Sequence, residues 1–284
     1  MYFEISEFRE RLRKTKESML RNRVEVLIVS DPANMNYLTG YDGWSFYVHQ
    51  GLVIALDHDE PIWWGRGMDG NGAKLTTWLK HENIRPYNDD YVQNIFKHPM
   101  SFVADIIREH GWDAKNLGVE MDNYWFTAKC LETLVGELPR MKIVDATSLV
   151  NWVRVIKSPA EIEYMRQASK VCENVMQTAI DSIQEGKSES SAAANVYHSC
   201  VLGTPEFTGD HPAIFPIMPS NERTSCAHLG WDPERKYAKG DLILLELTGV
   251  RFRYHCPLSR TAFIGEPSKQ LRQVEQTVLR GVEE

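Results

Sequence analysis

The stretch "VRVIKSPAEIEYMRQA", residues 153–168, divides the sequence into two parts with different patterns. Ser158 and Pro159 interrupt a helical pattern, and Ser158 can cap a new helix that has Pro159 at its first position. With 284 residues, the chain is longer than a single hydrophobic core normally supports. We therefore predict two domains, which span residues 1–155 and 156–284.

The first part alternates strand patterns with helix patterns. Strands are predicted at "VEVLIVSD", "LVIALD", "PIWWG", "LGVEMD" and "KIVDA", which span residues 24–31, 52–57, 61–65, 117–122 and 142–146. Amphipathic helices are predicted over residues 6–22, 99–110 and 124–138. The glycine-rich run "GRGMDGNG" (65–72) lacks the spacing of a nucleotide-binding loop, and we interpret it as a turn. This alternation predicts an α/β domain.

The second part begins with helices and ends mainly with strands. After the helix that starts at Ser158, a second helix is predicted over residues 189–201. Strands are predicted at "AIFPIMPS", "SCAHLGW", "DLILLELTGV" and "RTAFIG", and a last amphipathic helix follows from Ser268; the strands span residues 213–220, 225–231, 241–250 and 260–265. Such segregation predicts an α+β domain.

The composition is that of an ordinary globular protein, with 43% hydrophobic and 25% charged residues. No apolar run approaches the length of a membrane span, and the charged N-terminal segment does not resemble a secretion signal. Five cysteines without a CxxC pair suit reduced thiols. A net charge of −7 disfavours nucleic acid. We therefore expect a cytoplasmic protein with a small-molecule substrate, which binds neither nucleic acid nor membrane.

Four segments, in this order and at this spacing, resemble the pita-bread enzymes, the family of creatinase, aminopeptidase P and prolidase. They are "VRVIKSPAEIEYMRQA", "PSNERTSCAH" (219–228), "KGDLILLELTGV" (239–250) and "SRTAFIG" (259–265). The resemblance implies a creatinase-like α/β domain followed by an α+β pita-bread catalytic domain. The family's catalytic domain continues for roughly another hundred residues. The resemblance therefore implies a domain truncated at its C-terminus, either because the chain is a fragment or because the remainder is supplied elsewhere.

Further stretches resemble the ectoine hydrolase branch of this family. They are "TGYDGWSFYVHQ", "GVEMDNYWF", "VDATSLVNW" and "YHCPLSRT", at residues 39–50, 118–126, 144–152 and 254–261. This resemblance implies a cytosolic homodimer that hydrolyses a C–N bond of the cyclic amidine ectoine and releases an N-acetyl-2,4-diaminobutyrate.

The metal ligands of the family's peptidases are incomplete in this sequence. Those enzymes place one carboxylate in the strand that matches Leu244–Leu247 and a second carboxylate eleven residues later, so that both hold paired divalent ions. Here the two positions hold Glu246 and Pro257, and proline has no ligand atom. We therefore predict that the protein has no metal site here and no other cofactor.

Glu246 and His228 are the candidate catalytic residues. A glutamate within the apolar run "LILLELTGV" is expected to be buried, at a high cost unless it is paired or functional. Glu246 could attack the amidinium carbon or deprotonate water, and both alternatives stay open. His228 lies where the resemblance places creatinase's catalytic histidine, and it could protonate the leaving nitrogen. The alternative roles are an ion-pair partner for Glu246 and a structural histidine for His228.

Trp44, Phe46, Tyr47 and His255 are the candidate substrate-binding residues. The three aromatic residues lie in one short run, and an aromatic cage suits a cationic ring. They could also form a surface cluster or a dimer contact. In the creatinase-like branch this loop enters the partner subunit's site, so that the two roles are compatible. His255 could donate to the substrate, or it could serve packing or a backbone hydrogen bond.

Two other functions remain open from the sequence. A metal-dependent Xaa-Pro aminopeptidase or prolidase would require ligands that this chain lacks. A non-catalytic pita-bread module would bind peptides or another protein, and a solvent-exposed Glu246 far from His228 would favour it.

Overall fold

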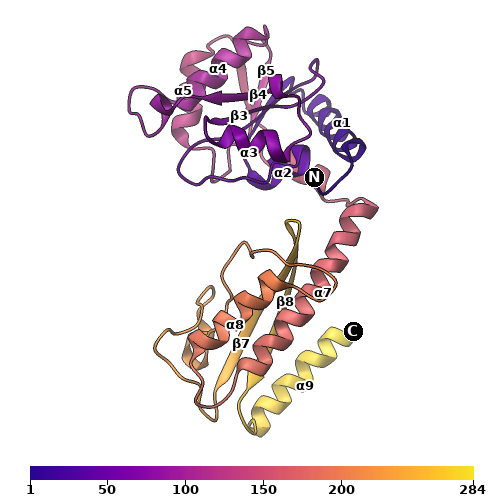
Figure 1. The fold of residues 1–284 in the computed structure, drawn as a ribbon, viewed down its shortest axis with the longest axis vertical. Coiled ribbons are helices and arrows are strands. Elements are labelled where there is room, and N and C mark those ends of the chain that lie inside the picture. Colours follow the sequence, from indigo (N-terminus) through magenta and orange to yellow (C-terminus); the bar gives the residue numbers. More distant parts are fainter. The chain divides into compact units, whose positions relative to one another are not determined.

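The computed structural model describes residues 1–284 and divides into two compact units, unit 1 (residues 1–157) and unit 2 (residues 158–284). Figure 1 shows both units, which are described separately below. None of the helices combines the length and the apolar character that crossing a membrane would require.

Unit 1 contains a six-stranded mixed sheet with the strand order β4-β3-β2-β1-β5-β6. Strand β2 pairs antiparallel with β1 and β3, whereas the remaining neighbours are parallel. The strands are β1 (Val26–Val29), β2 (Gly51–Ala55), β3 (Ile62–Arg66), β4 (Ile84–Tyr87), β5 (Asn116–Val119) and β6 (Lys142–Asp145). The helices are α1 (Ile5–Arg21), α2 (Pro32–Thr39), α3 (Asp69–Thr76), α4 (Pro99–Glu109), α5 (Ala128–Glu137) and α6 (Leu149–Arg154), with short 3-10 helices η1 (His81–Asn83) and η2 (Asp89–Tyr91).

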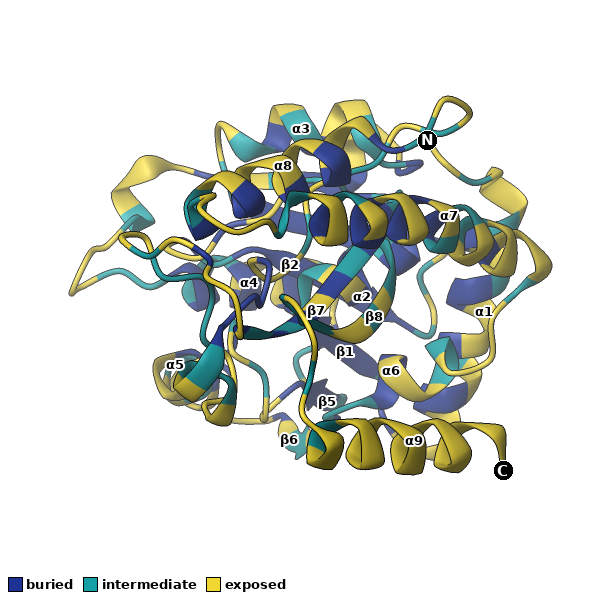
Figure 2. Cartoon of the chain, turned by 90° about the horizontal axis from the view of Figure 1, so that it is seen from below, coloured by how far each residue is buried: buried dark blue, intermediate teal, exposed yellow.

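Helices cover both faces of this sheet, which explains the continuous apolar strands in the sequence. Leu27 and Trp63 face a core that receives side chains from α1, α2, α3 and α6. Ile28 and Trp64, the next residues on the same strands, face a second core that receives side chains from α4 and α5. Figure 2 shows strands β1 and β5 as buried elements. The α/β prediction for this part of the chain is confirmed.

Unit 2 contains a long antiparallel hairpin and three helices. The hairpin consists of β7 (Leu242–Arg251) and β8 (Tyr254–Phe263). The helices are α7 (Pro159–Ser182), α8 (Glu189–Leu202) and α9 (Lys269–Glu283), with a 3-10 helix η3 (Asn221–Ser225). Side chains of α7 and α8 pack with alternate residues of β7 in a single core, whereas α9 has no buried residue and is almost entirely exposed in Figure 2.

The predicted helix start at Ser158 is confirmed. The Ser158 hydroxyl accepts a hydrogen bond from the backbone N–H of Glu161 at 3.3 Å, and the Glu161 carboxylate accepts one from the backbone N–H of Ser158 at 2.8 Å. This reciprocal pair satisfies two donors that the first turn would otherwise leave without partners. Glu161 also accepts a hydrogen bond from the Tyr254 hydroxyl at 2.8 Å, which joins the start of α7 to the start of β8.

Helix α7 and strand β7 approach most closely at Gly249. A Cβ atom at this position would lie 2.2 Å from the carbonyl oxygen of Ala168 and 2.2 Å from the backbone nitrogen of Cys172. Both neighbours are helix backbone, so neither can rotate away. Any side chain at residue 249 would therefore push the helix off the strand.

We expect Gly249→Ala to lower the free energy of unfolding by about 1–3 kcal/mol, because overpacking of this kind forces backbone shifts. Gly281→Ala in α9 is the matched control, since nothing lies within 4 Å of a Cβ there. Urea unfolding of both variants measures the difference. Equal stability of Gly249→Ala and the unmodified protein would contradict the close approach.

The predicted strands at 213–220 and 225–231 are wrong. Only isolated bridges form in the first segment, where Ile217 pairs with Glu246 and Ser220 pairs with Ile243. Prolines within and beside this segment lack the backbone donor that a continuous ladder requires. The second segment overlaps η3 and continues as a loop in which His228 adopts a left-handed φ of 64°. An apolar pattern therefore did not suffice to form strands here.

The helix pattern at 124–138 and the glycine-rich run at 65–72 also differ from expectation. Helix α5 begins four residues late because the Thr127 hydroxyl caps it by accepting from the backbone N–H of Cys130 at 3.4 Å. The last residues of the glycine-rich run form the first turn of α3 instead of a turn between elements. This helix packs on the unit 1 core through Ala73. Helix α2 and strand β4 were not predicted.

Candidate functional site

Glu246 lies on the face of β7 opposite the unit 2 core. Leu245 and Leu247 point into the core, so the side chain between them points away from it. Glu246 is exposed, and the expectation that it is buried is wrong. The apolar run misled the prediction because in this structure helices pack against only one face of the hairpin. The backbone of Glu246 exchanges hydrogen bonds with Ile217, at 2.9 and 3.3 Å.

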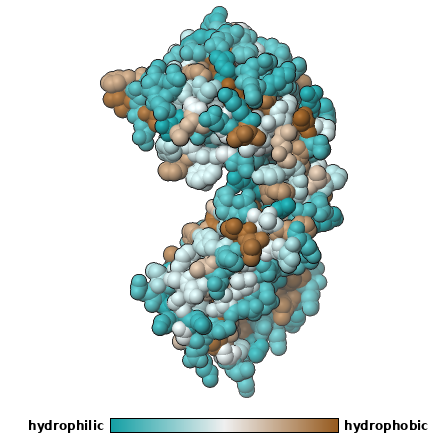
Figure 3. All heavy atoms as spheres, viewed as in Figure 1, coloured by the Kyte–Doolittle hydropathy of each residue, from teal (hydrophilic) through white to brown (hydrophobic).

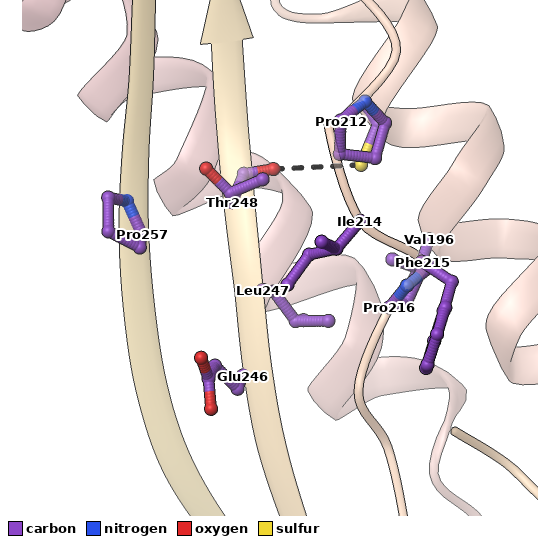
Figure 4. A pocket seen from close by; sticks show the side chains of 10 residues that line it. Val196, Pro212, Ile214, Phe215, Pro216, Glu246, Leu247, Thr248 and Pro257 are labelled. Atoms are coloured by element: carbon purple, nitrogen blue, oxygen red, sulfur yellow. Dashed lines mark hydrogen bonds between the residues drawn. The ribbon is translucent and has the colours of Figure 1, made fainter. Parts of the chain in front are cut away.

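The hairpin register places Pro257 beside Glu246. Glu246 pairs with Ser259, and Thr248 pairs with Pro257, so all four side chains share one face of the hairpin. Figure 4 shows Glu246 and Pro257 on adjacent strands. The Glu246 carboxylate has no hydrogen-bond or ion-pair partner in the structure. A proline therefore stands on the face where a second carboxylate would be needed for a paired-metal site.

A cavity of about 40 Å³ lies next to Glu246. Side chains from α8, β7, β8 and the segment 212–216 line it: Val196, Cys200, Pro212, Ile214, Phe215, Pro216, Glu246, Leu247, Thr248 and Pro257 (Figure 4). Glu246 is the single charged member of this apolar lining. A carboxylate without a protein counter-ion attracts positive charge, which favours a cationic ligand here.

His255 connects β8 to the segment that lines this cavity. One ring nitrogen, Nδ1, lies 2.9 Å from the carbonyl oxygen of Arg253, and the other, Nε2, accepts a hydrogen bond from the backbone N–H of Ala213 at 3.1 Å. Both ring nitrogens therefore have backbone partners, and the histidine holds the segment 212–216 against the hairpin. Its role in substrate binding stays a prediction.

His228 lies in the loop between η3 and β7. Its side chain is exposed, and it is not among the residues that line the cavity beside Glu246. A left-handed φ is uncommon for a residue other than glycine, so the loop holds this backbone in a conformation that costs energy. The structure does not bring His228 and Glu246 to one cavity, and their joint role stays a prediction.

The aromatic run of unit 1 is open to solvent. The exposed fractions of Trp44, Phe46 and Tyr47 are 57%, 79% and 49%. Their rings contact one another, with centroids 5.9 Å apart for Trp44 and Phe46 and 5.4 Å apart for Phe46 and Tyr47. The Tyr47 hydroxyl accepts a hydrogen bond from Arg66 at 3.0 Å. These rings form one of several groups of apolar residues that reach the surface, a distribution that Figure 3 shows for the face in view.

A buried ion-pair network supports the loop that carries His228, and sequence reasoning missed it. Glu189 is fully buried and accepts hydrogen bonds from Arg235 at 2.9 Å and from the Ser220 hydroxyl at 2.6 Å. Arg235 also donates to Asp241 at 2.8 Å, and this hydrogen bond lowers the pKa of Asp241 to about 2. The network joins α8 to both ends of the 220–241 segment. No sequence motif marks it.

A three-donor metal cluster is absent from the surroundings of Glu246. Among all 284 residues, one group of three histidine, cysteine or carboxylate side chains brings its ligand atoms together, and it lies in unit 1 at His49, His98 and Cys130. Pro257 offers no ligand atom on the face of the hairpin that carries Glu246, so this hairpin does not fit the paired-metal site of the family's peptidases.

Comparisons with known proteins agree with this architecture. Residues 11–156 match the creatinase/prolidase N-terminal domain, and residues 163–284 match metallopeptidase family M24. The ectoine hydrolase of Halomonas elongata is 43% identical over 99% of this chain and 71% of its own length. An uncharacterized hydrolase/peptidase of Sinorhizobium fredii is 38% identical over 100% of this chain and 72% of its own length.

Solved structures match at lower identity. The prolidase from Pyrococcus horikoshii superimposes with a TM-score of 0.75 and 20% identity, over 95% of this chain and 70% of that structure. This likeness establishes the fold, a creatinase-type N-terminal domain followed by a pita-bread domain. With both domain models matched in order and a relative at 43% identity, the chain belongs to the creatinase/prolidase family of hydrolases.

Proposed function

We propose that the protein hydrolyses the cyclic amidine ectoine to an N-acetyl-2,4-diaminobutyrate without a metal ion. One observation carries the metal-independent mechanism. The Glu246 carboxylate lacks a protein counter-ion, and Pro257 occupies the neighbouring position where a second carboxylate would be needed. The 43% identity to an ectoine hydrolase supports the choice of substrate.

The charge of the substrate explains why a lone carboxylate suits this reaction. The ectoine ring carries a protonated amidinium, which a divalent cation would repel and a carboxylate attracts. Glu246 pairs with the amidinium and then either attacks its central carbon or deprotonates the attacking water. The oxygen of water becomes the acetamide oxygen, the ring C–N bond breaks, and the departing nitrogen takes up a proton.

Three further parts of the proposal concern residues outside the cavity. His228 supplies the proton to the leaving nitrogen, since an imidazole can serve as a general acid. Trp44, Phe46 and Tyr47 present aromatic faces to the cationic ring. We also expect the enzyme to be a cytoplasmic homodimer, in which this aromatic run of one subunit serves the site of the other.

A non-catalytic binding module is the second candidate. The exposure of Glu246 and the absence of His228 from the lining of the adjacent cavity favour it. Such a module would bind cationic or proline-containing peptides and turn none of them over. A metal-dependent Xaa-Pro peptidase shares the fold, but Pro257 removes a ligand that its mechanism requires.

We expect purified protein to convert ectoine to its N-acetylated product at a rate that EDTA leaves unchanged within about twofold. Proton NMR of the reaction mixture identifies the product, and a Xaa-Pro dipeptide is the control substrate. Loss of activity with chelator and recovery with Mn²⁺ would contradict metal independence. Failure to convert either substrate, with retained binding of ectoine, would favour the non-catalytic module.

A further inference from the structure

Three side chains of the types that coordinate metal ions come together within unit 1, although they are far apart in the sequence. His49 lies just before β2, His98 is the N-cap of α4, and Cys130 lies in the first turn of α5. One ring nitrogen of each histidine and the cysteine sulfur all lie within 4.8 Å of one another. We propose that these three side chains bind one Zn²⁺ ion.

Binding of an ion requires a change in the contacts of the histidines. The Nδ1 atom of His98 accepts a hydrogen bond from the backbone N–H of Met100 at 3.2 Å, so Nε2 carries the proton in the neutral ring. Zinc binding through Nε2 would move this proton to Nδ1 and break that hydrogen bond. The sulfur of Cys130 lies 3.8 Å from both ring nitrogens of His49. One of these nitrogens has a backbone hydrogen-bond partner in Trp125, so the ring would turn to direct the other nitrogen to a shared ion. The centroids of the two imidazole rings are 5.1 Å apart.

The backbone holds these ligands in position. The carbonyl oxygen of His49 accepts a hydrogen bond from the Tyr87 hydroxyl at 2.5 Å, which fixes the end of the aromatic run to β4. The Thr127 hydroxyl lies 3.4 Å from the Cys130 sulfur and caps the same helix. Cys130 is 1% exposed, so its side chain has little freedom to turn elsewhere. The site is therefore built from secondary-structure ends rather than from loose surface side chains.

Zinc binding requires a neutral ring from each histidine and a thiolate from Cys130, so the thiol proton of Cys130 leaves to solvent when the ion binds.

Two imidazoles and a thiolate are a zinc-type donor set. Zn²⁺ prefers tetrahedral coordination, with bonds of about 2.0–2.1 Å to nitrogen and ~2.3 Å to sulfur. Tetrahedral bonds of that length put the ligand atoms roughly 3.3–3.6 Å apart, so the cluster must contract by about 1 Å at its widest separation. A cavity of about 120 Å³ lined by both histidines adjoins the cluster and has room for water as the fourth ligand.

The ion would act on the aromatic run through His49. Tyr47 lies two residues before this ligand and also lines the same cavity. An ion shared with α4 and α5 would anchor the end of this run, whatever substrate the enzyme takes. Zinc binding in unit 1 does not require the proposed reaction at Glu246, although the run that the ion anchors belongs to the proposed substrate site.

Cobalt substitution tests the site directly, since Co²⁺ reports tetrahedral geometry and thiolate ligation by visible absorption. We expect one Co²⁺ per chain to give intense d–d bands and a thiolate charge-transfer band, and one equivalent of Zn²⁺ to remove both. His98→Asn should weaken binding at least ~100-fold because it removes one of three protein ligands, while asparagine preserves the helix cap. Cys130→Ser should abolish the charge-transfer band. Cys226→Ser is the matched control, because Cys226 is exposed and outside the cluster.

Thermal unfolding gives a second measurement that does not require the cysteine variant to fold well. Zn²⁺ at 100 times its dissociation constant should raise the stability of the unmodified protein and of Cys226→Ser, but not that of His98→Asn. An unchanged cobalt spectrum in His98→Asn, loss of the band in Cys226→Ser, or absence of a thiolate band in the unmodified protein would each overturn the site.

The variant His98→Asn also distinguishes effects of the zinc site from effects on the proposed reaction at Glu246. His98→Asn lacks the unit 1 ion, so an effect of EDTA on ectoine turnover that persists in this variant must come from another ion. Ectoine turnover without any cobalt band would contradict the zinc site alone. A cobalt band without ectoine turnover would contradict the proposed reaction alone.

Discussion

Glu246→Gln should lower kcat for ectoine by at least ~10²-fold, the loss typical of removing a general base or nucleophile. Glutamine keeps the size of the side chain but removes the negative charge and the reactive lone pair. Because the Glu246 carboxylate has no partner among residues 1–284, the substitution breaks no ion pair among them, and their fold should persist. Ligand binding should weaken less than turnover, since the apolar lining of the cavity is unchanged.

Steady-state kinetics on ectoine, with circular dichroism to check folding, measures this effect. Glu206→Gln is the matched control, because Glu206 is an exposed glutamate of unit 2 outside the lining of the cavity. Near-normal turnover in a folded Glu246→Gln protein would remove the carboxylate from the mechanism. A loss of binding as large as the loss of turnover would indicate a role in substrate attraction alone.

Glu189→Ala should lower the free energy of unfolding by about 3–5 kcal/mol, the usual effect of removing one partner from a buried ion pair. The substitution takes an acceptor away from Arg235 and from the buried Ser220 hydroxyl. It also leaves the backbone N–H of Asp232 without the carboxylate oxygen that accepts its hydrogen bond at 2.7 Å. Alanine favours the helix in which residue 189 lies, so helix propensity cannot account for the loss.

Urea unfolding measured alongside Glu234→Ala tests this prediction. Glu234 is an exposed neighbour of Arg235 without a side-chain partner, and its replacement should change stability by less than ~0.5 kcal/mol. Similar midpoints for the two variants would show that the buried network contributes little. A change in the slope of the unfolding curve would indicate an altered unfolded state instead.

Local signals with a defined chemistry were enough to predict much of the fold. Ser158 followed by Pro159 marked the start of α7 because a cap and a fixed φ act within one helical turn. The alternating elements of unit 1 followed from apolar runs that are buried on both faces of the sheet. At 213–231 the same kind of run was misleading, because prolines and a left-handed His228 prevent continuous strand pairing.

The candidate site could be predicted only in part. The substitution of Pro257 for a carboxylate was visible in the sequence, and the hairpin register places it beside Glu246. The exposure of Glu246 was not predictable, because an apolar strand pattern does not reveal which face receives a packing partner. The Glu189 network and the His49, His98 and Cys130 cluster join residues far apart in the sequence, and no local pattern records such contacts.

The glycine contact between β7 and α7 has a mechanical consequence for Glu246. At Gly249 the backbone of the strand contacts the backbone of the helix directly, with no side chain between them. Glu246 lies three residues before this contact, and its backbone is also held by Ile217. The backbone that carries the Glu246 side chain is therefore fixed on two sides. A backbone that keeps its place before the substrate arrives loses little energy to rearrangement when the substrate binds.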